Sequence, residues 1–220
     1  MRNEHTMYET ILFDLDGTLL DTLEDLTNAT NFALAKFGYL KRSQEEVCSF
    51  VGNGIAKLIE RAIGEKTQDF LEVLESFKGY YGAHCAEKTK PYEGILPLLK
   101  TLKEYGIRTA VVSNKADFAV KSLAKEYFDG LLMQAIGEDE ERGIRKKPAP
   151  DTLLAVMKEL QADPKTTLYV GDSEVDIQTA QNAGIDCLCV TWGFRKREFL
   201  EAQGGKLFVD HPIEILEFCQ

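Results

Sequence analysis

The order in which this sequence predicts its helices and strands constrains the fold more than any other feature. Residues 10–16, TILFDLD, form a short apolar run that ends in acidic residues, which is typical of a buried strand that runs into a polar loop. Residues 22–89 then show only helical stripes of apolar residues, and from Pro91 onward strands alternate with helices. Strands separated by helices predict crossover connections and a mostly parallel sheet. Because a lone first strand needs a sheet to join, we interpret the helical stretch as an insertion into an α/β domain.

Capping and stop signals predict where individual elements begin and end. Asp21 with Glu24, and Ser43 with Glu46, resemble the capping boxes that open helices. Gly64 is a natural helix stop. The predicted strands after the first are the β-branched or apolar runs at residues 108–113, 131–136, 167–171, 187–191 and 207–209.

The net charge argues against two classes of partner. The 220 residues include 36 acidic and 26 basic ones, which gives a formal net charge of −10. A nucleic-acid binder that relies on phosphate contacts needs a basic face, and so does a protein held electrostatically to an anionic membrane. No apolar run reaches the roughly 18 residues of a membrane span, and the start of the chain has no apolar stretch of the secretory type. We therefore expect a cytoplasmic protein, monomeric or homodimeric, with neither nucleic acid nor membrane as a partner.

The cysteines and histidines show no metal-binding spacing. The five cysteines are odd in number and form no C-x-x-C motif, so neither a disulfide framework nor a zinc site is indicated. Cys187 and Cys189 alternate within an apolar run, which favours buried free thiols in a reducing cytoplasm. His5, His84 and His211 lie far apart in the sequence, and we expect none of them to bind a metal or act in catalysis.

Polar side chains follow several of the predicted strands at the point where each strand ends. Each of these residues alone has a structural alternative, because such residues are common in turns and helix caps. Together they should converge, since functional loops gather at the carboxyl ends of parallel strands. Close carboxylates need a cation or a shared proton, and hard oxygen ligands suit Mg²⁺. The sequence therefore predicts a Mg²⁺ site beside an anion site, built from Asp14 and Asp16, Ser113 and Asn114, Asp172 and Asp176, and the loop residues Lys146 and Lys147.

Four motifs carry a resemblance to a known family. DLDGT at residues 14–18, Ser113, Lys147-Pro148 and GDSEVD at residues 171–176 resemble, in this order, the motifs of the haloacid dehalogenase superfamily. The resemblance covers nearly the whole chain. It implies an α/β fold, with a Rossmann-like core whose parallel sheet is flanked by helices (residues 1–20 and 90–220) and an inserted all-helical cap domain (residues 21–89). In detail, DLDGTLLDT, VGNG at residues 51–54 and VGDSEVDI resemble the phosphoglycolate phosphatase branch.

The resemblance also implies a role for each motif residue. Asp14 would be the nucleophile that forms an aspartyl-phosphate, and Asp16 would protonate the leaving oxygen and then deprotonate the attacking water. Mg²⁺ would neutralise the phosphoryl oxygens and the Asp14 carboxylate. The metal ligands would be Asp14, the backbone carbonyl of Asp16, and Asp172, and Asp176 would support the metal site. The phosphoryl group would be bound by Ser113, Asn114 and Lys147, with Thr18 as a weaker candidate.

The implied function is Mg²⁺-dependent hydrolysis of a small phosphorylated metabolite, with 2-phosphoglycolate as the first expected substrate. Asp16 argues against a dehalogenase, which needs no acid for its leaving group and lacks this carboxylate. Pyrophosphate and nucleotides stay open as substrates, and so does phosphotransfer of the β-phosphoglucomutase type, which keeps this carboxylate. A phospho-receiver signalling domain is disfavoured, because it is shorter and has its phosphorylated aspartate on a middle strand.

The predicted cap supplies further expectations about specificity. We expect the loop Gly52-Asn53-Gly54 to be flexible enough to reach the active site. Lys57 or Arg61 could bind a substrate carboxylate, with a solvated surface position as the alternative for both.

Overall fold

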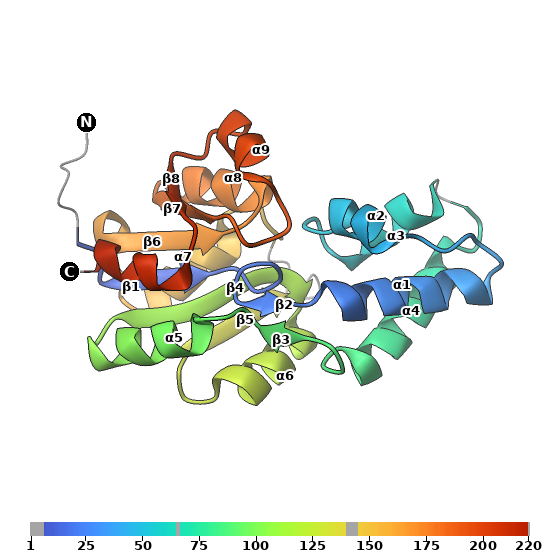
Figure 1. Ribbon diagram of the computed structural model, residues 1–220, viewed down its shortest axis with the longest axis horizontal. Coiled ribbons are helices and arrows are strands. Elements are labelled where there is room, and N and C mark those ends of the chain that lie inside the picture. The colour runs from blue at the N-terminus through green and yellow to red at the C-terminus, as the bar shows by residue number, and fades with distance from the viewer. Residues whose placement is uncertain (1–6, 65–66, 140–144, 220) are drawn as a thin grey trace.

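Six parallel strands form a sheet in the larger part of the molecule (Figure 1). The computed structural model describes residues 7–64, 67–139 and 145–219. The chain begins the sheet in the middle, so that later strands are added on both sides of the first one. In spatial order the strands are β5 (Gln134–Glu138), β4 (Arg108–Ala116), β1 (Thr10–Phe13), β6 (Thr167–Gly171), β7 (Asp186–Val190) and β8 (Leu207–Val209).

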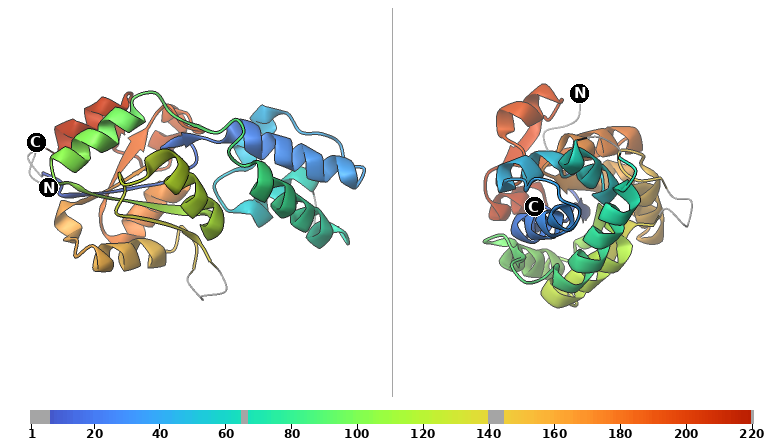
Figure 2. Two further views of the ribbon diagram at one scale, coloured as in Figure 1. Left: turned by 90° about the horizontal axis from the view of Figure 1, so that it is seen from below. Right: turned by 90° about the vertical axis from the view of Figure 1, so that its right-hand side faces the viewer.

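Helices cover both faces of this sheet (Figure 2). Side chains alternate along β1, so Ile11 and Phe13 belong to one apolar cluster and Leu12 to another. The cluster of Phe13 also contains side chains of α5 (Ile95–Glu104) and α6 (Asp117–Phe128). The cluster of Leu12 contains side chains of α7 (Asp151–Glu159) and α8 (Glu174–Ala183). The short elements η2 (Pro164–Thr166), α9 (Arg197–Ala202) and η3 (Pro212–Phe218) complete this part.

Four helices form a separate group beside the sheet (Figure 1). They are α1 (Leu23–Lys36), α2 (Gln44–Phe50), α3 (Ile55–Ile63) and α4 (Phe70–His84), and α1 packs against the other three. An antiparallel pair of two-residue strands, β2 (Leu20–Asp21) and β3 (Lys90–Pro91), lies where the chain enters and leaves this group. The predicted α/β core with an inserted helical cap is therefore confirmed. The domain limits at residues 20/21 and 89/90 stay a prediction, and the β2–β3 pair lies across them.

The structure corrects some predicted element boundaries. Helix α1 begins at Leu23 with Thr22 as a cap that makes no side-chain bond, so the capping box predicted at Asp21 and Glu24 is wrong. The box at Ser43 and Glu46 is confirmed. Strand β4 runs on to Ala116, because a second stretch of pairing with β5 follows an irregularity. That same pairing places β5 at residues 134–138 instead of 131–136.

The prediction of buried thiols is confirmed for Cys189 and wrong for Cys187, which is half-buried. All five cysteines are free thiols, with Cys85 and Cys189 buried and the others half-buried. Across residues 7–64, 67–139 and 145–219, no helix is both long and apolar enough to cross a membrane. His5, the start of the chain and part of the charged run at residues 138–147 lie outside the described residues.

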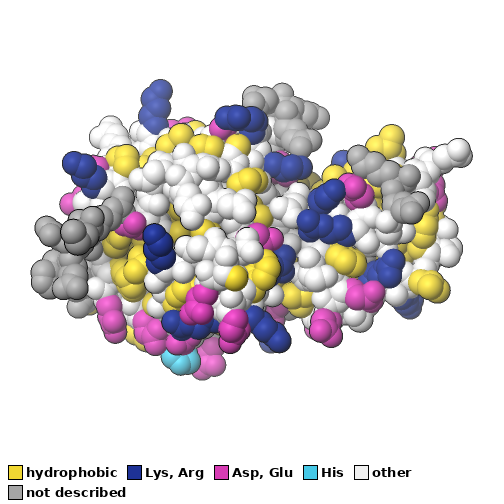
Figure 3. Space-filling model, turned by 90° about the horizontal axis from the view of Figure 1, so that it is seen from above, with side chains coloured by type: hydrophobic (Ala, Val, Ile, Leu, Met, Phe, Trp, Pro, Cys, Tyr) yellow, Lys and Arg dark blue, Asp and Glu magenta, His cyan; other side chains and the backbone are white. Residues whose placement is uncertain are grey.

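Charged side chains of both signs are distributed over the surface. On the face drawn in Figure 3, basic side chains are scattered among acidic ones instead of gathering into one basic face. Many of the acidic side chains on this face lie along its lower edge (Figure 3).

Candidate active site

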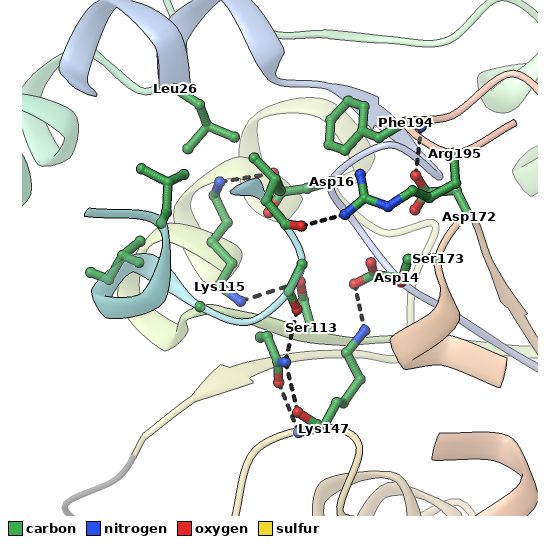
Figure 4. Close-up of a pocket in the computed structure, with 16 residues that line it drawn as sticks. Asp14, Asp16, Leu26, Ser113, Lys115, Lys147, Asp172, Ser173, Phe194 and Arg195 are labelled. Atoms are coloured by element: carbon green, nitrogen blue, oxygen red, sulfur yellow. Dashed lines mark hydrogen bonds and ion pairs between the residues drawn. The ribbon is translucent and has the colours of Figure 1, made fainter. Parts of the chain in front are cut away.

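A cavity lies at the carboxyl end of β1, between the sheet and the helical group (Figure 4). The strand order reverses next to β1, and such a switch point is where open parallel sheets place their ligand sites. The helical group contributes Leu26, Ile55 and Leu58 to the cavity wall, together with the loop at residues 51–54. Of the residues predicted from the sequence, those that line the cavity are Asp14, Asp16, Ser113, Asn114, Lys147 and Asp172.

Asp14 lies at the centre of a buried charge cluster. Its backbone N–H donates to the carbonyl oxygen of Val170 at 2.9 Å, which continues the β1–β6 ladder to the site. Its Oδ1 lies 2.9 Å from Lys147 Nζ, an ion pair that is not aligned as a hydrogen bond. Burial raises the pKa of Asp14 to about 6; Lys147 opposes the rise, and Asp176 and Asp16 add to it. Lys147 alone therefore does not compensate the negative charge of this carboxylate.

Lys147 is held in place by side chains and by its own backbone. Its Nζ donates to Asp176 Oδ1 at 2.7 Å and to the Tyr169 hydroxyl at 2.8 Å. Burial opposes the charge of Lys147, but Asp14 and Asp176 outweigh burial and raise its pKa well above the usual range. Asn114 Oδ1 accepts from the backbone N–H of Lys147 at 2.8 Å, and Asn114 Nδ2 donates to its carbonyl oxygen at 2.9 Å. Asn114 thus positions Lys147, and its role as a phosphate ligand stays a prediction.

Asp172 follows β6 and faces Asp14. Its Oδ2 accepts from the backbone N–H of Phe194 at 2.7 Å, and its Oδ1 accepts from Thr18 Oγ1 at 3.2 Å. Gly17 and Gly193 lie so close to the Asp172 side chain that a Cβ at either position would collide with it. Burial, together with the charges of Asp176 and Asp14, raises the pKa of Asp172 well above the usual range.

The donor set of these aspartates fits a divalent cation. Asp14, Asp172 and Asp176 each place a carboxylate oxygen within 4.8 Å of the others, and all three are buried. Asp176 accepts from Lys147 and Tyr169 on Oδ1, and from the backbone N–H and Oγ of Ser173 on Oδ2. Asp14 and Asp172 accept fewer hydrogen bonds than Asp176. These two carboxylates are therefore more open to a cation. A set of hard oxygen atoms without nitrogen or sulfur suits Mg²⁺.

Asp16 and Ser113 lie on the other side of the cavity, with a lysine that the sequence analysis did not single out. The Asp16 side chain is 12% exposed, and Lys115 Nζ donates to its Oδ1 at 2.8 Å. Figure 4 shows Lys115 pointing to Asp16 and Lys147 pointing to Asp14. The predicted strand ends at Ser113, which leaves Lys115 out of the site. Strand β4 continues to Ala116 through an irregularity in its pairing with β5, and this places Lys115 beside Asp16.

The loop at residues 51–54 covers part of the cavity. Gly52 and Gly54 line it, and Asn114 Nδ2 donates to the carbonyl oxygen of Gly52 at 3.1 Å. The loop therefore reaches the site, and its predicted flexibility stays a prediction. Arg195, which follows β7, donates to the carbonyl oxygens of Val51 at 2.8 Å and Cys48 at 2.9 Å. No motif of the sequence points to this arginine.

Neither cap residue considered for substrate binding lines the cavity. Lys57 pairs with Glu60 at 2.9 Å. Arg61 donates to the carbonyl oxygen of Phe50 at 2.8 Å and to Asn53 Oδ1 at 2.7 Å, so it supports the covering loop.

Comparisons with known proteins agree with the site. The model of the haloacid dehalogenase-like hydrolase family matches residues 11–190. Phosphoglycolate phosphatase of Aquifex aeolicus is 33% identical, with 94% of each chain covered. N-acetylmuramic acid 6-phosphate phosphatase of Pseudomonas aeruginosa is 30% identical, with 94% of this chain and 92% of that protein covered.

A solved structure is also similar over nearly its whole length. The crystal structure of a candidate phosphoglycolate phosphatase from Lactobacillus delbrueckii subsp. bulgaricus has a TM-score of 0.92 and 39% identity, with 97% of this chain and 98% of that chain covered. The chain is therefore a member of the haloacid dehalogenase-like hydrolase family, and within it a phosphatase that resembles the phosphoglycolate phosphatases.

Proposed function

We propose that this protein is a Mg²⁺-dependent phosphatase that hydrolyses a small phosphomonoester through an aspartyl-phosphate on Asp14. One observation carries the proposal. Asp14, a second carboxylate at Asp16, the ammonium group of Lys147 and the hydroxyl of Ser113 all line one cavity. A nucleophile, an acid and the positive charge needed to bind an anion are thus brought together.

The first step transfers the phosphoryl group to the protein. A carboxylate oxygen of Asp14 attacks phosphorus, and the bond from phosphorus to the leaving oxygen breaks. Asp16 donates its proton to that oxygen, so the alcohol departs neutral. Lys147 pairs with Asp14 and lies where it can hold a phosphoryl oxygen, and Ser113 can donate to another.

The second step regenerates the protein. Asp16, now ionised, takes a proton from water, and the water oxygen attacks phosphorus. The bond from phosphorus to the Asp14 oxygen breaks, which releases inorganic phosphate and restores the Asp14 carboxylate. Leu26, Ile55, Leu58 and Phe194 form an apolar wall that limits the access of other water molecules.

The proposed metal site accounts for how an anionic substrate can meet an anionic nucleophile. Asp14 and Asp172, with the backbone carbonyl of Asp16, would hold Mg²⁺, and Asp176 would support them through Ser173 and Lys147. When bound, Mg²⁺ supplies positive charge that neutralises the phosphoryl oxygens and the attacking carboxylate.

The names of two relatives indicate which substrate to test first. The relatives are named for phosphoglycolate and N-acetylmuramic acid 6-phosphate, and both compounds join a phosphate ester to a carboxylic acid. We take 2-phosphoglycolate as the first substrate to test because it is the smaller of the two.

Phosphate release over a substrate panel tests this function. The panel contains 2-phosphoglycolate, N-acetylmuramic acid 6-phosphate, pyrophosphate, a nucleoside monophosphate and a hexose phosphate, each with Mg²⁺ and with a chelator. We expect the highest kcat/KM for 2-phosphoglycolate, loss of activity with chelator, and no turnover by Asp14→Asn. The exposed Asp129→Asn is the matched control and should behave as wild type. Metal-independent hydrolysis, or turnover by Asp14→Asn, would contradict the proposal.

A further inference from the structure

A buried lysine links Asp16 to the helical group. Lys115 Nζ lies 2.8 Å from Asp16 Oδ1 and also donates to the hydroxyl oxygen of Tyr81. The Lys115 side chain is 2% exposed, and Tyr81 is 3% exposed. Asp16 follows β1, Lys115 lies on β4 and Tyr81 lies on α4. Three segments that are remote in the sequence therefore meet at one ammonium group.

The sheet fixes the backbone of Lys115 in this position. Pairing between β4 and β5 shifts register between Val112 and Ala116, and Lys115 lies within that irregularity. Gly137 on β5 lies against the carbonyl oxygen of Lys115, and a Cβ there would collide with it and with the backbone of Asp117. The place of Lys115 is thus set by the packing of β4 on β5 as well as by its pairing with Asp16.

Tyr81 is fixed from the other side. Its ring stacks on Phe77 with centroids 5.3 Å apart and planes at 15°. Lys115 Nζ lies 4.6 Å from the centroid of the Tyr81 ring, in addition to its bond to the hydroxyl. A lysine side chain has many rotamers to lose on ordering, so two fixed partners are needed to hold its ammonium in one place.

We propose that Lys115 and Tyr81 are positioning residues that orient the Asp16 carboxyl group toward the oxygen it protonates. The inference rests on the proposed phosphatase function, in which Asp16 is the acid. An acid must lie within hydrogen-bond reach of the leaving oxygen, and small displacements of a reacting group cost large factors in rate. Because Tyr81 belongs to α4, the helical group helps to position the acid as well as covering the cavity.

The dependence of rate on the leaving group separates this role from a structural one. An alkyl phosphate such as 2-phosphoglycolate needs its leaving oxygen protonated, whereas p-nitrophenyl phosphate releases a stable anion. The parameter to measure is kcat/KM, because it covers the steps up to departure of the leaving group. Tyr81→Phe removes only a hydroxyl and should lower kcat/KM about tenfold for the alkyl ester and less than about twofold for the aryl ester. Lys115→Met should show the same contrast at about 100-fold for the alkyl ester.

Two controls make the result specific. Asp16→Asn should show the largest contrast between the two esters, and Tyr80→Phe, the same chemical change one residue away, should alter neither rate. Equal losses of Tyr81→Phe on both esters, or no loss on either, would overturn the inference while leaving the phosphatase function in place. If the wild type hydrolyses neither ester, the proposed function itself fails, and the inference fails with it. If Lys115→Met does not fold, Tyr81→Phe alone still tests whether these residues position Asp16.

Discussion

Replacing Asp25 by alanine should lower the free energy of unfolding by about 3 kcal/mol. Asp25 lies on α1 and is 3% exposed. Its Oδ2 accepts from the backbone N–H of Thr89 at 2.8 Å, from Thr89 Oγ1 at 2.9 Å and from the backbone N–H of Lys88 at 2.9 Å. This one carboxylate therefore joins the segment that enters the helical group to the segment that leaves it.

The magnitude follows from which donors lose their acceptor. Lys88 is exposed, so water can replace Asp25 at its N–H. Thr89 is 5% exposed, and its two donors would be left unsatisfied. Each such group costs about 1–3 kcal/mol, which supports a total near 3 kcal/mol. For a chain of this length the loss corresponds to a fall in Tm of about 6–12 °C.

Urea unfolding followed by circular dichroism measures this change. Asp25→Asn keeps one acceptor oxygen and should lose about half as much free energy as Asp25→Ala. The neighbouring Glu24→Ala is the matched control, because Glu24 is exposed and should cost less than about 1 kcal/mol. If Asp25→Ala costs no more than Glu24→Ala, the carboxylate does not hold the two segments together and the reasoning is refuted.

Three further predictions concern the metal and the covering loop. Mg²⁺ at about 100 times its Kd should stabilise the protein by about 2.7 kcal/mol, and Asp172→Asn should abolish this gain in a thermal-shift assay. Protons compete with the cation for Asp14, whose pKa is raised to about 6, and for Asp172, whose pKa is also raised. Calorimetry should therefore show Mg²⁺ affinity at least about tenfold weaker near pH 5 than near pH 7.5, and equal affinities would refute this. Arg195→Met removes the bonds to Val51 and Cys48 and should raise KM about tenfold with a smaller effect on kcat, whereas the half-exposed Arg197→Met should leave steady-state kinetics unchanged. An unchanged KM for Arg195→Met would mean that the arginine does not hold the loop.

The sequence predicts best the part of the site that follows from strand ends. Asp14, Ser113 and Asp172 each come directly after or at the end of an apolar run, and in a parallel sheet those ends meet at one edge. Their convergence therefore needs only the element order and the rule that active loops gather there.

The missed contacts depend on geometry that no local pattern contains. Lys115 becomes a site residue only because β4 continues through an irregularity in its pairing with β5. Tyr81 looks like one more member of an apolar helical stripe, and its hydroxyl matters only where α4 meets β4. Arg195 reaches backbone carbonyls 144 or more residues away, and Asp25 finds its partners 63 residues or more further along the chain. Such contacts follow from the relative placement of sheet and cap, which the sequence pattern leaves undetermined.

The covalent intermediate on Asp14 tests the central claim most directly. Wild-type protein is mixed with Mg²⁺ and 2-phosphoglycolate, or with the best substrate of the panel, and quenched in acid within the first turnover. Digestion and mass spectrometry should find the peptide that contains Asp14 heavier by one phosphoryl group, with fragmentation placing that group on Asp14. Asp14→Asn should give no labelled peptide. Phosphate release by the wild type with no label on Asp14, or with the label on another residue, would contradict the account.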